Sequence, residues 1–585
     1  MKKLNLLIML CFIMILILHQ AKPIYSQVSE NEKRYIRIGS LQSHFTAYGS
    51  ERAWNNVYYE GLAWPADYSY QDNAVIKRAW IAARDFTDAN GYHWDYWGTY
   101  ISKGYVGNSL YPMELKQTAK FEPPTVYVDG INITAPYAWD VDKINPDQIP
   151  DRIVTNIVNT TLGLTMTRRI LAFSQQYHDN YFIKEFIFKN TGNVDYDEEI
   201  ELCDSLKGVR IGCGTRYSVC REGAMKIDNQ QIWGKHSWVT KRGEDYHLHA
   251  NDHIPDDYTI VDWIRCGFSW FGQSERVSFD NVGAADINSD GRLCAPQHAG
   301  IAILHVDKSA TDDSDDPNQP VALGWHAGDT YPSVGDISPS DSINILKLYN
   351  FLSGNPYPNE NMGGTDRMDE TYLSSITDPV DPYTIHGDGG GTNVWICYGP
   401  FDLAHGDSII IVEAEGISGL SRQMCEEIGG RWKQAYDNPG DTGPFTLPDS
   451  STTNNKDVFK NTWVCTGKDS ILLTFSRAKR NYDMGYYIQQ PPPPPSIFEV
   501  ISFTDRITLL WNNSAESSPG FAGYKIYCAE GRYDTTFQEI FACGPGTDHP
   551  DVVNSYEDTD VTYGHDYYYY IVSFDDGSAN NGIPL

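Results

Sequence analysis

One short run of the chain has the residue types and spacing of a calcium loop. Asp286, Asn288 and Asp290 alternate along it, and Gly291 follows at the sixth position. Oxygen side chains at alternate positions allow a tight loop to fold around a hard cation, and the carbonyl group of Arg292 would add a ligand. We therefore predict a structural Ca²⁺ site at Asp286, Asn288, Asp290 and Arg292. A polar hairpin turn is the alternative, because Asp, Asn and Gly are also turn residues.

A histidine-rich segment raises a second metal hypothesis. On a strand, His247 and His249 would point the same way, as two metal ligands should. His253 or Asp252 would supply a third ligand. A solvated strand end is the alternative interpretation of the same residues.

Paired carboxylates are the main catalytic signal. Glu413 and Glu415 share one face of a predicted strand, and hydrolysis of a glycosidic bond needs two carboxylates that flank it. The aromatic run 94–97 surrounds Asp95 and offers ring faces on which sugars could stack. However, the chain has 77 acidic residues, so chance pairs are certain. The aromatic residues can equally belong to a core.

Common signatures of nucleotide-binding proteins and hydrolases are missing from the sequence. The glycine-rich run 387–391 has no lysine and precedes no predicted helix, so it does not fit a phosphate loop. Neither a Gly-x-Ser-x-Gly elbow nor a His-Glu-x-x-His motif occurs. The sequence thus favours a protein without catalytic activity over an enzyme.

Composition and charge narrow the classes of partner. The formal net charge is −32, which repels nucleic acid and anionic lipid surfaces. An aromatic content of 13% is too high for a disordered chain, while 49 Gly and 31 Pro favour turns over helices. We expect a mostly β protein with several domains, built from antiparallel β-sandwiches with a few helices, and no binding of nucleic acid.

The N-terminus has the layout of a secretory signal peptide. Lys2 and Lys3 precede an apolar run at 6–18, and Ser26–Gln27 offers a cleavage point. The apolar run is short for a membrane span. We therefore expect a secreted or cell-surface protein with no integral membrane segment in the mature chain. Because the chain ends soon after its last predicted strand, we expect it to be a fragment of a longer protein.

Ten cysteines remain once the signal peptide is removed, and an even number in an exported chain allows disulfides. A bridge between Cys528 and Cys543 would close a hairpin near the C-terminus. The spacing of Cys203, Cys213 and Cys220 does not fit a zinc site.

Local patterns predict the elements that would position these residues. Helical spacing of apolar residues predicts a helix over 75–87, with Asp72 as its cap. A second helix is expected at 421–436, and the pattern at 469–478 fits either a strand or a helix. Strands are expected at 164–173, 181–189, 196–202, 393–398 and 408–415. We expect the strands at 393–398 and 408–415 to pair with each other.

The C-terminal region follows five consecutive prolines at 491–495, a stiff spacer. Three strand-like runs follow, at 507–511, 523–527 and 564–573, rich in aromatic and β-branched residues. Their order and spacing resemble a fibronectin type III domain. Together with the hairpin-like segment 399–416, the arrangement resembles a group of large, uncharacterised secreted bacterial proteins. That resemblance implies β regions followed by a proline run and an immunoglobulin-like sandwich, and it implies no activity.

These patterns predict the following organisation: a signal peptide at 1–27, an aromatic-rich region with one helix at 28–150, a β-sandwich region at 151–335, a mixed β/α region at 336–490, the polyproline linker at 491–495 and a fibronectin type III-like domain at 496–585. We predict a secreted or cell-surface protein with a binding, adhesive or structural role, whose partners are extracellular proteins or polysaccharides. The alternative is an extracellular carbohydrate-active enzyme or glycan-binding protein.

Overall fold

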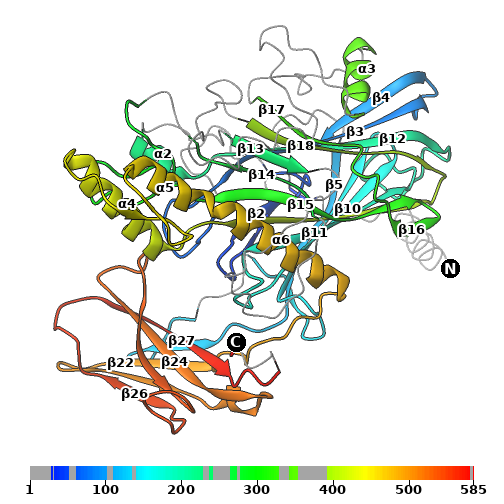
Figure 1. The fold of residues 1–585 in the computed structure, drawn as a ribbon. Coiled ribbons are helices and arrows are strands. Elements are labelled where there is room, and N and C mark those ends of the chain that lie inside the picture. The colour runs from blue at the N-terminus through cyan, green and yellow to red at the C-terminus, as the bar shows by residue number, and fades with distance from the viewer. Residues whose placement is uncertain are drawn as a thin grey trace, which may run out of the picture.

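The computed structural model describes residues 28–29, 32–51, 61–101, 110–134, 140–227, 236–240, 264–272, 277–327, 342–353, 392–579 and 584–585. Its chain is mostly β, with several antiparallel sheets and few helices, which confirms the predicted fold class. Figure 1 shows a large upper body and a smaller C-terminal body below it. We call them the main sandwich and the terminal domain.

The main sandwich contains a ten-stranded sheet. Nine of its strands run in the order β13 (His236–Thr240), β14 (Arg265–Trp270), β15 (His298–Ser309), β19 (Ser408–Ser418), β11 (Tyr181–Asn190), β10 (Leu164–Ala172), β9 (Arg152–Thr160), β5 (Leu110–Ala119) and β8 (Lys143–Ile144), and β16 (Asp312–Asp315) pairs with β15. Helix α6 (Gly467–Asp483) crosses one face of this sheet (Figure 1) and buries Ile471 and Phe475 against it.

A five-stranded sheet packs on the opposite face. Its order is β17 (Ala322–Ala327), β18 (Thr392–Leu403), β12 (Leu206–Tyr217), β3 (Ala74–Thr87) and β4 (His93–Ile101). Ile81 and Ile396 of this sheet share one core with Met166 and Ile411 of the larger sheet. Helix α3 (Ser342–Phe351) covers its outer face.

The helix predicted at 75–87 is wrong, because these residues form β3. Ile81 and Ala83 belong to the core between the sheets, whereas Trp80 and Ala82 face the cluster under α3. Both faces of β3 are therefore apolar, and a strand that is buried on both faces has no polar alternation to distinguish it from a helix.

The strand predictions had mixed outcomes. Those at 164–173 and 181–189 are confirmed as β10 and β11, which pair antiparallel. No strand forms at 196–202. The strands at 393–398 and 408–415 exist within β18 and β19, but their mutual pairing is wrong. β18 pairs with β12 and β17, while β19 pairs with β11 and β15 in the other sheet.

The predicted helix at 421–436 is confirmed as α4 (Arg422–Asp437). Ser421 caps it by accepting a hydrogen bond from the backbone N–H of Met424, at 3.2 Å. Segment 469–478 lies within α6 and is thus helical. Two shorter helices, α2 (Arg221–Ile227) and α5 (Lys456–Cys465), complete the helical edge seen on the left in Figure 1.

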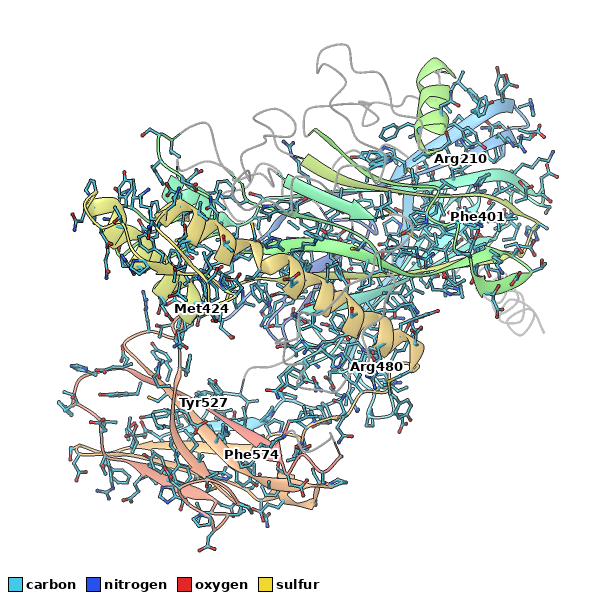
Figure 2. The ribbon with its side chains drawn as sticks, in the orientation of Figure 1. Arg210, Phe401, Met424, Arg480, Tyr527 and Phe574 are labelled. Carbon is cyan, nitrogen blue, oxygen red and sulfur yellow. The ribbon has the colours of Figure 1, made fainter. Side chains whose placement is uncertain are left out.

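The terminal domain is a sandwich of two small sheets. One contains β26 (Ser555–Asp558), β23 (Ile507–Trp511) and β22 (Ile497–Ser502), and the other contains β25 (Gln538–Cys543), β24 (Phe521–Glu530) and β27 (Tyr567–Asp575). Trp511 and Tyr524 meet edge to face between them, with ring centroids 5.6 Å apart. Tyr527 and Phe574 are labelled in Figure 2, on β24 and β27.

A hairpin from the N-terminal part of the chain extends the terminal domain. Its strands are β6 (Thr125–Val128) and β7 (Ile131–Asn132), joined by Asp129 and Gly130, which both have positive φ as a two-residue hairpin turn requires. β6 pairs in parallel with β22, so the strand order of this sheet is β26-β23-β22-β6-β7. We call residues 123–134 the arm. It ties the terminal domain directly to the main sandwich.

All ten cysteines of the described residues are free thiols. The predicted bridge between Cys528 and Cys543 is wrong, because β24 and β25 pair Cys528 with Gln538 and Cys543 with Tyr524. The two cysteines are therefore four positions apart along the ladder, about 13 Å, whereas a disulfide needs Cα atoms within about 7 Å. Among the described helices, none combines the length and apolar character needed to cross a membrane.

Candidate functional site

The two acids predicted as a catalytic pair lie inside the main sandwich. Glu413 and Glu415 do share a face of β19, and that face points into the interior between the sheets. Their exposed fractions are 3% and 0%. The prediction of a shared face was correct, but the face is not a surface that a polysaccharide could reach.

Cationic and phenolic side chains satisfy this pair. Lys77 of β3 donates to Oε2 of Glu415 at 2.6 Å, and Lys184 of β11 donates to the same oxygen. The hydroxyl group of Tyr398 donates to Oε1 of Glu413 at 2.7 Å. Strands of both sheets thus contribute donors to carboxylates that are excluded from water.

A further buried pair completes this group. Arg168 of β10 donates to Oε1 of Glu51 at 2.8 Å. Burial alone would raise the pKa of Glu51, but Arg168, Lys77 and Lys184 together lower it to about 2. We call Glu51, Lys77, Arg168, Lys184, Glu413 and Glu415 the charge layer. It balances three acids against three bases, as buried charges require.

The surroundings shift the pKa values of Glu413 and Glu415 in opposite directions. Burial raises the pKa of Glu413, and this effect outweighs the hydrogen bond from Tyr398. Burial acts on Glu415 in the same direction, but the two lysines reverse it and lower the pKa of this group. The pKa values of the two acids are therefore shifted in opposite directions.

The aromatic run 94–97 does not form an open platform. Trp97 is buried in the main core, and Tyr96 packs on Tyr349 of α3 with ring centroids 4.9 Å apart. The indole N–H of Trp94 donates to Asp88 at 3.1 Å. These rings stabilise the β3–β4 hairpin rather than line one cleft.

The predicted calcium residues form a tight turn beside α4. The backbone N–H of Asp286 donates to the carbonyl group of Arg292 at 3.0 Å, and Asp290 accepts from the N–H of Arg292 at 3.0 Å. The carboxylate of Asp286 pairs with Lys226 at 2.6 Å, and it also accepts from the N–H of Asn288 at 3.2 Å. This geometry matches the polar turn that the sequence left as an alternative, while calcium binding stays a prediction.

The turn also fits closely against α4. A Cβ atom added to Gly429 would lie 2.2 Å from the carbonyl oxygen of Gly291, so the helix approaches the turn without room for a side chain. Gly430 has no such contact within 3.7 Å. The turn therefore has a clear packing role, whether or not it binds an ion.

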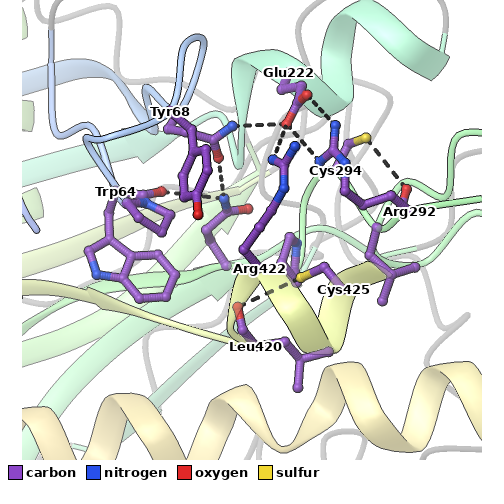
Figure 3. Close-up of a pocket in the computed structure, with 13 residues that line it drawn as sticks. Trp64, Tyr68, Glu222, Arg292, Cys294, Leu420, Arg422 and Cys425 are labelled. Atoms are coloured by element: carbon purple, nitrogen blue, oxygen red, sulfur yellow. Dashed lines mark hydrogen bonds and ion pairs between the residues drawn. The ribbon is translucent and has the colours of Figure 1, made fainter. Parts of the chain in front are cut away.

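A small pocket lies where α2, this turn and α4 meet (Figure 3). Glu222 accepts hydrogen bonds there from Gln71 at 2.9 Å and from Arg292 at 2.5 and 3.1 Å. The guanidinium group of Arg422 lies 3.9 Å from Glu222 and 4.7 Å from the ring centre of Tyr68. Two arginines and one acid give the lining of the pocket a net positive charge. The side chains leave a free volume of only about 20 Å³ between them.

A larger pocket lies where β3 ends and β12 begins. It encloses about 350 Å³ and is lined by Arg84, Asp85, Asp204, Ser205 and Lys207, among others. Lys207 pairs with Asp85, and both side chains are about half exposed. Charged groups of both signs and a hydroxyl group around such a volume suit a small polar ligand. No sequence motif indicated this site, because its residues come from strand ends and a loop.

An acidic cluster lies in the loop after β11. Single carboxylate oxygens of Asp195, Asp197 and Glu201 lie within 4.8 Å of one another. Consecutive Asx turns shape the loop, since Asp197 N–H donates to Asp195 and Glu199 N–H donates to Asp197. Segments of this kind are common without an ion, and we assign it no ligand.

One predicted site and one rejected motif lie outside the described residues. These are the histidine segment with His247, His249 and His253, and the glycine-rich run 387–391. The signal peptide at 1–27 lies outside them as well. Among known protein families no model matches the chain, and no curated protein matches it significantly.

Proposed function

We propose that this is a secreted or cell-surface protein with a binding, adhesive or structural role, whose terminal domain is a fibronectin type III-like module. The apolar N-terminal run and the charge of −32 support a location outside the cytoplasm. The two small sheets around Trp511 and Tyr524 support the identification of the module. Partners would be extracellular proteins or polysaccharides.

The observation that carries this proposal is the continuous sheet between the arm and the terminal domain. Backbone N–H groups of Thr125 and Asp129 donate to Ser496 and Val500, at 2.8 and 2.9 Å. A flexible tether would suit a module that searches for its ligand. A shared sheet instead fixes the module in one orientation, which suits a protein that bears load or presents a surface.

A second contact between the main sandwich and the terminal domain supports the same proposal. The hydroxyl group of Tyr68 lies 3.0 Å from that of Thr536, and Ser69 donates to Asp534 at 2.8 Å. These residues join the main sandwich to a loop of the terminal domain at a site distant from the arm in sequence. Two points of attachment restrict rotation more than one does.

Burial of the only acid pair with a predicted catalytic role also favours a role without catalysis. Two lysines pair with Glu415, Tyr398 donates a hydrogen bond to Glu413, and both acids lie inside the sandwich. General acid–base chemistry on a polysaccharide requires contact with the substrate. Their burial therefore favours a binding, adhesive or structural role over the enzyme hypothesis.

Glycan binding is the second candidate function. The pocket of about 350 Å³ at Asp85, Asp204 and Lys207 supports it, because hydroxyl-rich ligands need both donors and acceptors. No aromatic platform of the predicted kind supplements it within the described residues. This candidate therefore rests on the pocket alone.

A sedimentation assay of the mature protein on insoluble polysaccharides and bacterial cell envelopes tests the proposal, with released sugars measured in parallel. We expect envelope binding or self-assembly without released sugar. Release of sugar would refute the non-catalytic role and favour the enzyme alternative. A protein that binds none of these surfaces and does not self-assemble would also contradict the proposal.

A double variant separates the two candidates. Asp204→Ala with Lys207→Ala removes two exposed groups of the pocket, and Asp449→Ala, an exposed acid elsewhere, serves as the control. Polysaccharide binding through the pocket would be lost in the double variant only. Binding that is equal in all three proteins would assign adhesion to another surface.

A further inference from the structure

One of the buried contacts between the two sheets of the main sandwich joins an amine to a carboxylate. Nζ of Lys77, on β3, lies 2.6 Å from Oε2 of Glu415, on β19. The two residues are 338 positions apart in sequence. Their side chains are 8% and 0% exposed, so the pair is held in place and shielded from solvent.

We propose that Lys77 and Glu415 condense to a side-chain amide, an isopeptide cross-link between the two sheets. A buried amine and carboxyl group in fixed contact have lost the translational freedom that slows the same reaction between free molecules. The cross-link would also replace two buried charges by a neutral amide, which is less costly to keep out of water.

The balance of the step needs no external reagent. The ammonium group of Lys77 and the carboxylate of Glu415 together give one amide and one water. A C–N bond forms at Cδ of Glu415, and one C–O bond breaks. Two of the three ammonium protons leave on the departing oxygen as water, and the third remains on the amide nitrogen. No oxidant, reductant or activated ester takes part.

The surroundings supply the groups that such a condensation requires. Lys184 contacts the same oxygen of Glu415 and would stabilise negative charge that develops there when nitrogen attacks. Glu413 lies two residues earlier on the same strand face, and its hydrogen bond from Tyr398 holds it in position. It is the nearby acid that would carry a proton from the amine to the departing oxygen.

The pKa shifts of Lys77 and Glu413 agree with these roles, whereas the lysines shift Glu415 toward its less reactive carboxylate form. Burial lowers the pKa of Lys77, which makes its nucleophilic amine form more accessible, and burial raises the pKa of Glu413. For Lys184, burial acts downward, but Glu415 and Glu51 reverse the effect and raise its pKa. The two lysines on one carboxylate are thus unequal, and Lys77 is the better nucleophile.

Peptide mapping of the folded protein by mass spectrometry tests the proposal. We expect a branched peptide that contains both Lys77 and Glu415, lighter than the sum of its two parts by one water. Recovery of both residues only in separate, unmodified peptides after prolonged incubation of the folded protein would refute the proposal. A branch at Lys184 instead would refute the assignment of Lys77.

Variants add a test of the neighbouring acid. Glu413→Gln should slow formation of the branched peptide at least tenfold, whereas Glu51→Gln, which alters the charge layer at its other ion pair, should change the rate much less. Circular dichroism establishes that each variant is folded before the comparison. Equal rates in Glu413→Gln and the parent would contradict the proton-transfer role of Glu413. The mapping of the parent protein does not depend on any variant.

Discussion

The arm should be necessary for docking of the terminal domain. Val126 of β6 is half-buried and packs against the core of the terminal domain, opposite Phe498 of β22. Val126→Asp would place a carboxylate against that core. On the same hairpin, Ile131 of β7 is 67% exposed, so Ile131→Asp is a matched control that adds the same charge without contact to the core.

The size of the effect follows from the contacts. Besides the ladder hydrogen bonds between β6 and β22, three further hydrogen bonds link the arm to β22 and its end, from Thr125 to Ser496, from Asp129 to Val500 and from Ser502 to Asp129. At about 1 kcal/mol net each, they stabilise docking by about 3 kcal/mol. Partial burial of Val126 adds about 1 kcal/mol. An unpaired carboxylate costs several kcal/mol, enough to undock the arm.

Hydrogen exchange and calorimetry measure the result. In Val126→Asp we expect faster exchange in the arm and in β22, and a separate melting transition of the terminal domain. Ile131→Asp should behave as the parent. If both variants keep parental exchange in β22 and a single transition, the arm does not hold the domain and the reasoning is refuted.

Three further predictions concern buried or close-packed groups. Burial lowers the pKa of His298 to about 3, so only the unfolded chain gains a proton there as pH falls below 6.5. This residue alone should lower the free energy of unfolding by about 2 kcal/mol between pH 7 and 5, and a denaturation series of His298→Gln that keeps the parental pH slope would contradict this. Calcium should raise the melting temperature of the parent but not of Asp286→Ala with Asp290→Ala, and equal melting of the parent in calcium and in chelator would remove the calcium prediction. Gly429→Ala should destabilise the protein by about 1–3 kcal/mol, because its Cβ would lie 2.2 Å from a carbonyl oxygen of the turn. Gly430→Ala should stabilise it by up to about 1 kcal/mol in the same denaturation assay, and effects of equal sign would contradict the close approach.

Strands with one polar and one apolar face were predictable from the sequence. β10 alternates between core and partly exposed residues along most of its length, and its period of two is clear. β3 was missed because α3 covers its second face with Trp80 and Ala82 buried. Whether a second face is covered depends on an element far along the chain, and local periodicity does not contain that information.

The pairing of strands was harder to predict for the same reason. Only four residues separate β18 from β19, which normally indicates a hairpin. The chain instead passes from one sheet to the other, because each strand finds its partners among strands that lie earlier in the sequence. The sequence therefore predicted both strands and their faces but not their neighbours.

The charge layer could have been suspected from lysines on apolar strand faces. Lys184 shares its face of β11 with Phe182 and Phe186, and a charged residue there must find a partner across the core. The identity of the partner, Glu415, depends on the register of β19 against β11. The sequence thus indicates that a buried ion pair exists, but it does not identify the acidic partner of the lysine.

The same layer makes the register of β19 costly to change. A slip by one residue would turn Glu413 and Glu415 toward α6 and bring Val412 and Ala414 to face the lysines. Lys77 and Lys184 would then be buried without a carboxylate, and α6 would cover two unpaired acids. An apolar layer would tolerate such a slip better, since any apolar side chain fits another approximately. Buried charge thus lowers stability relative to an ideal apolar core, yet it penalises the competing register far more, and this difference selects one arrangement of the two sheets.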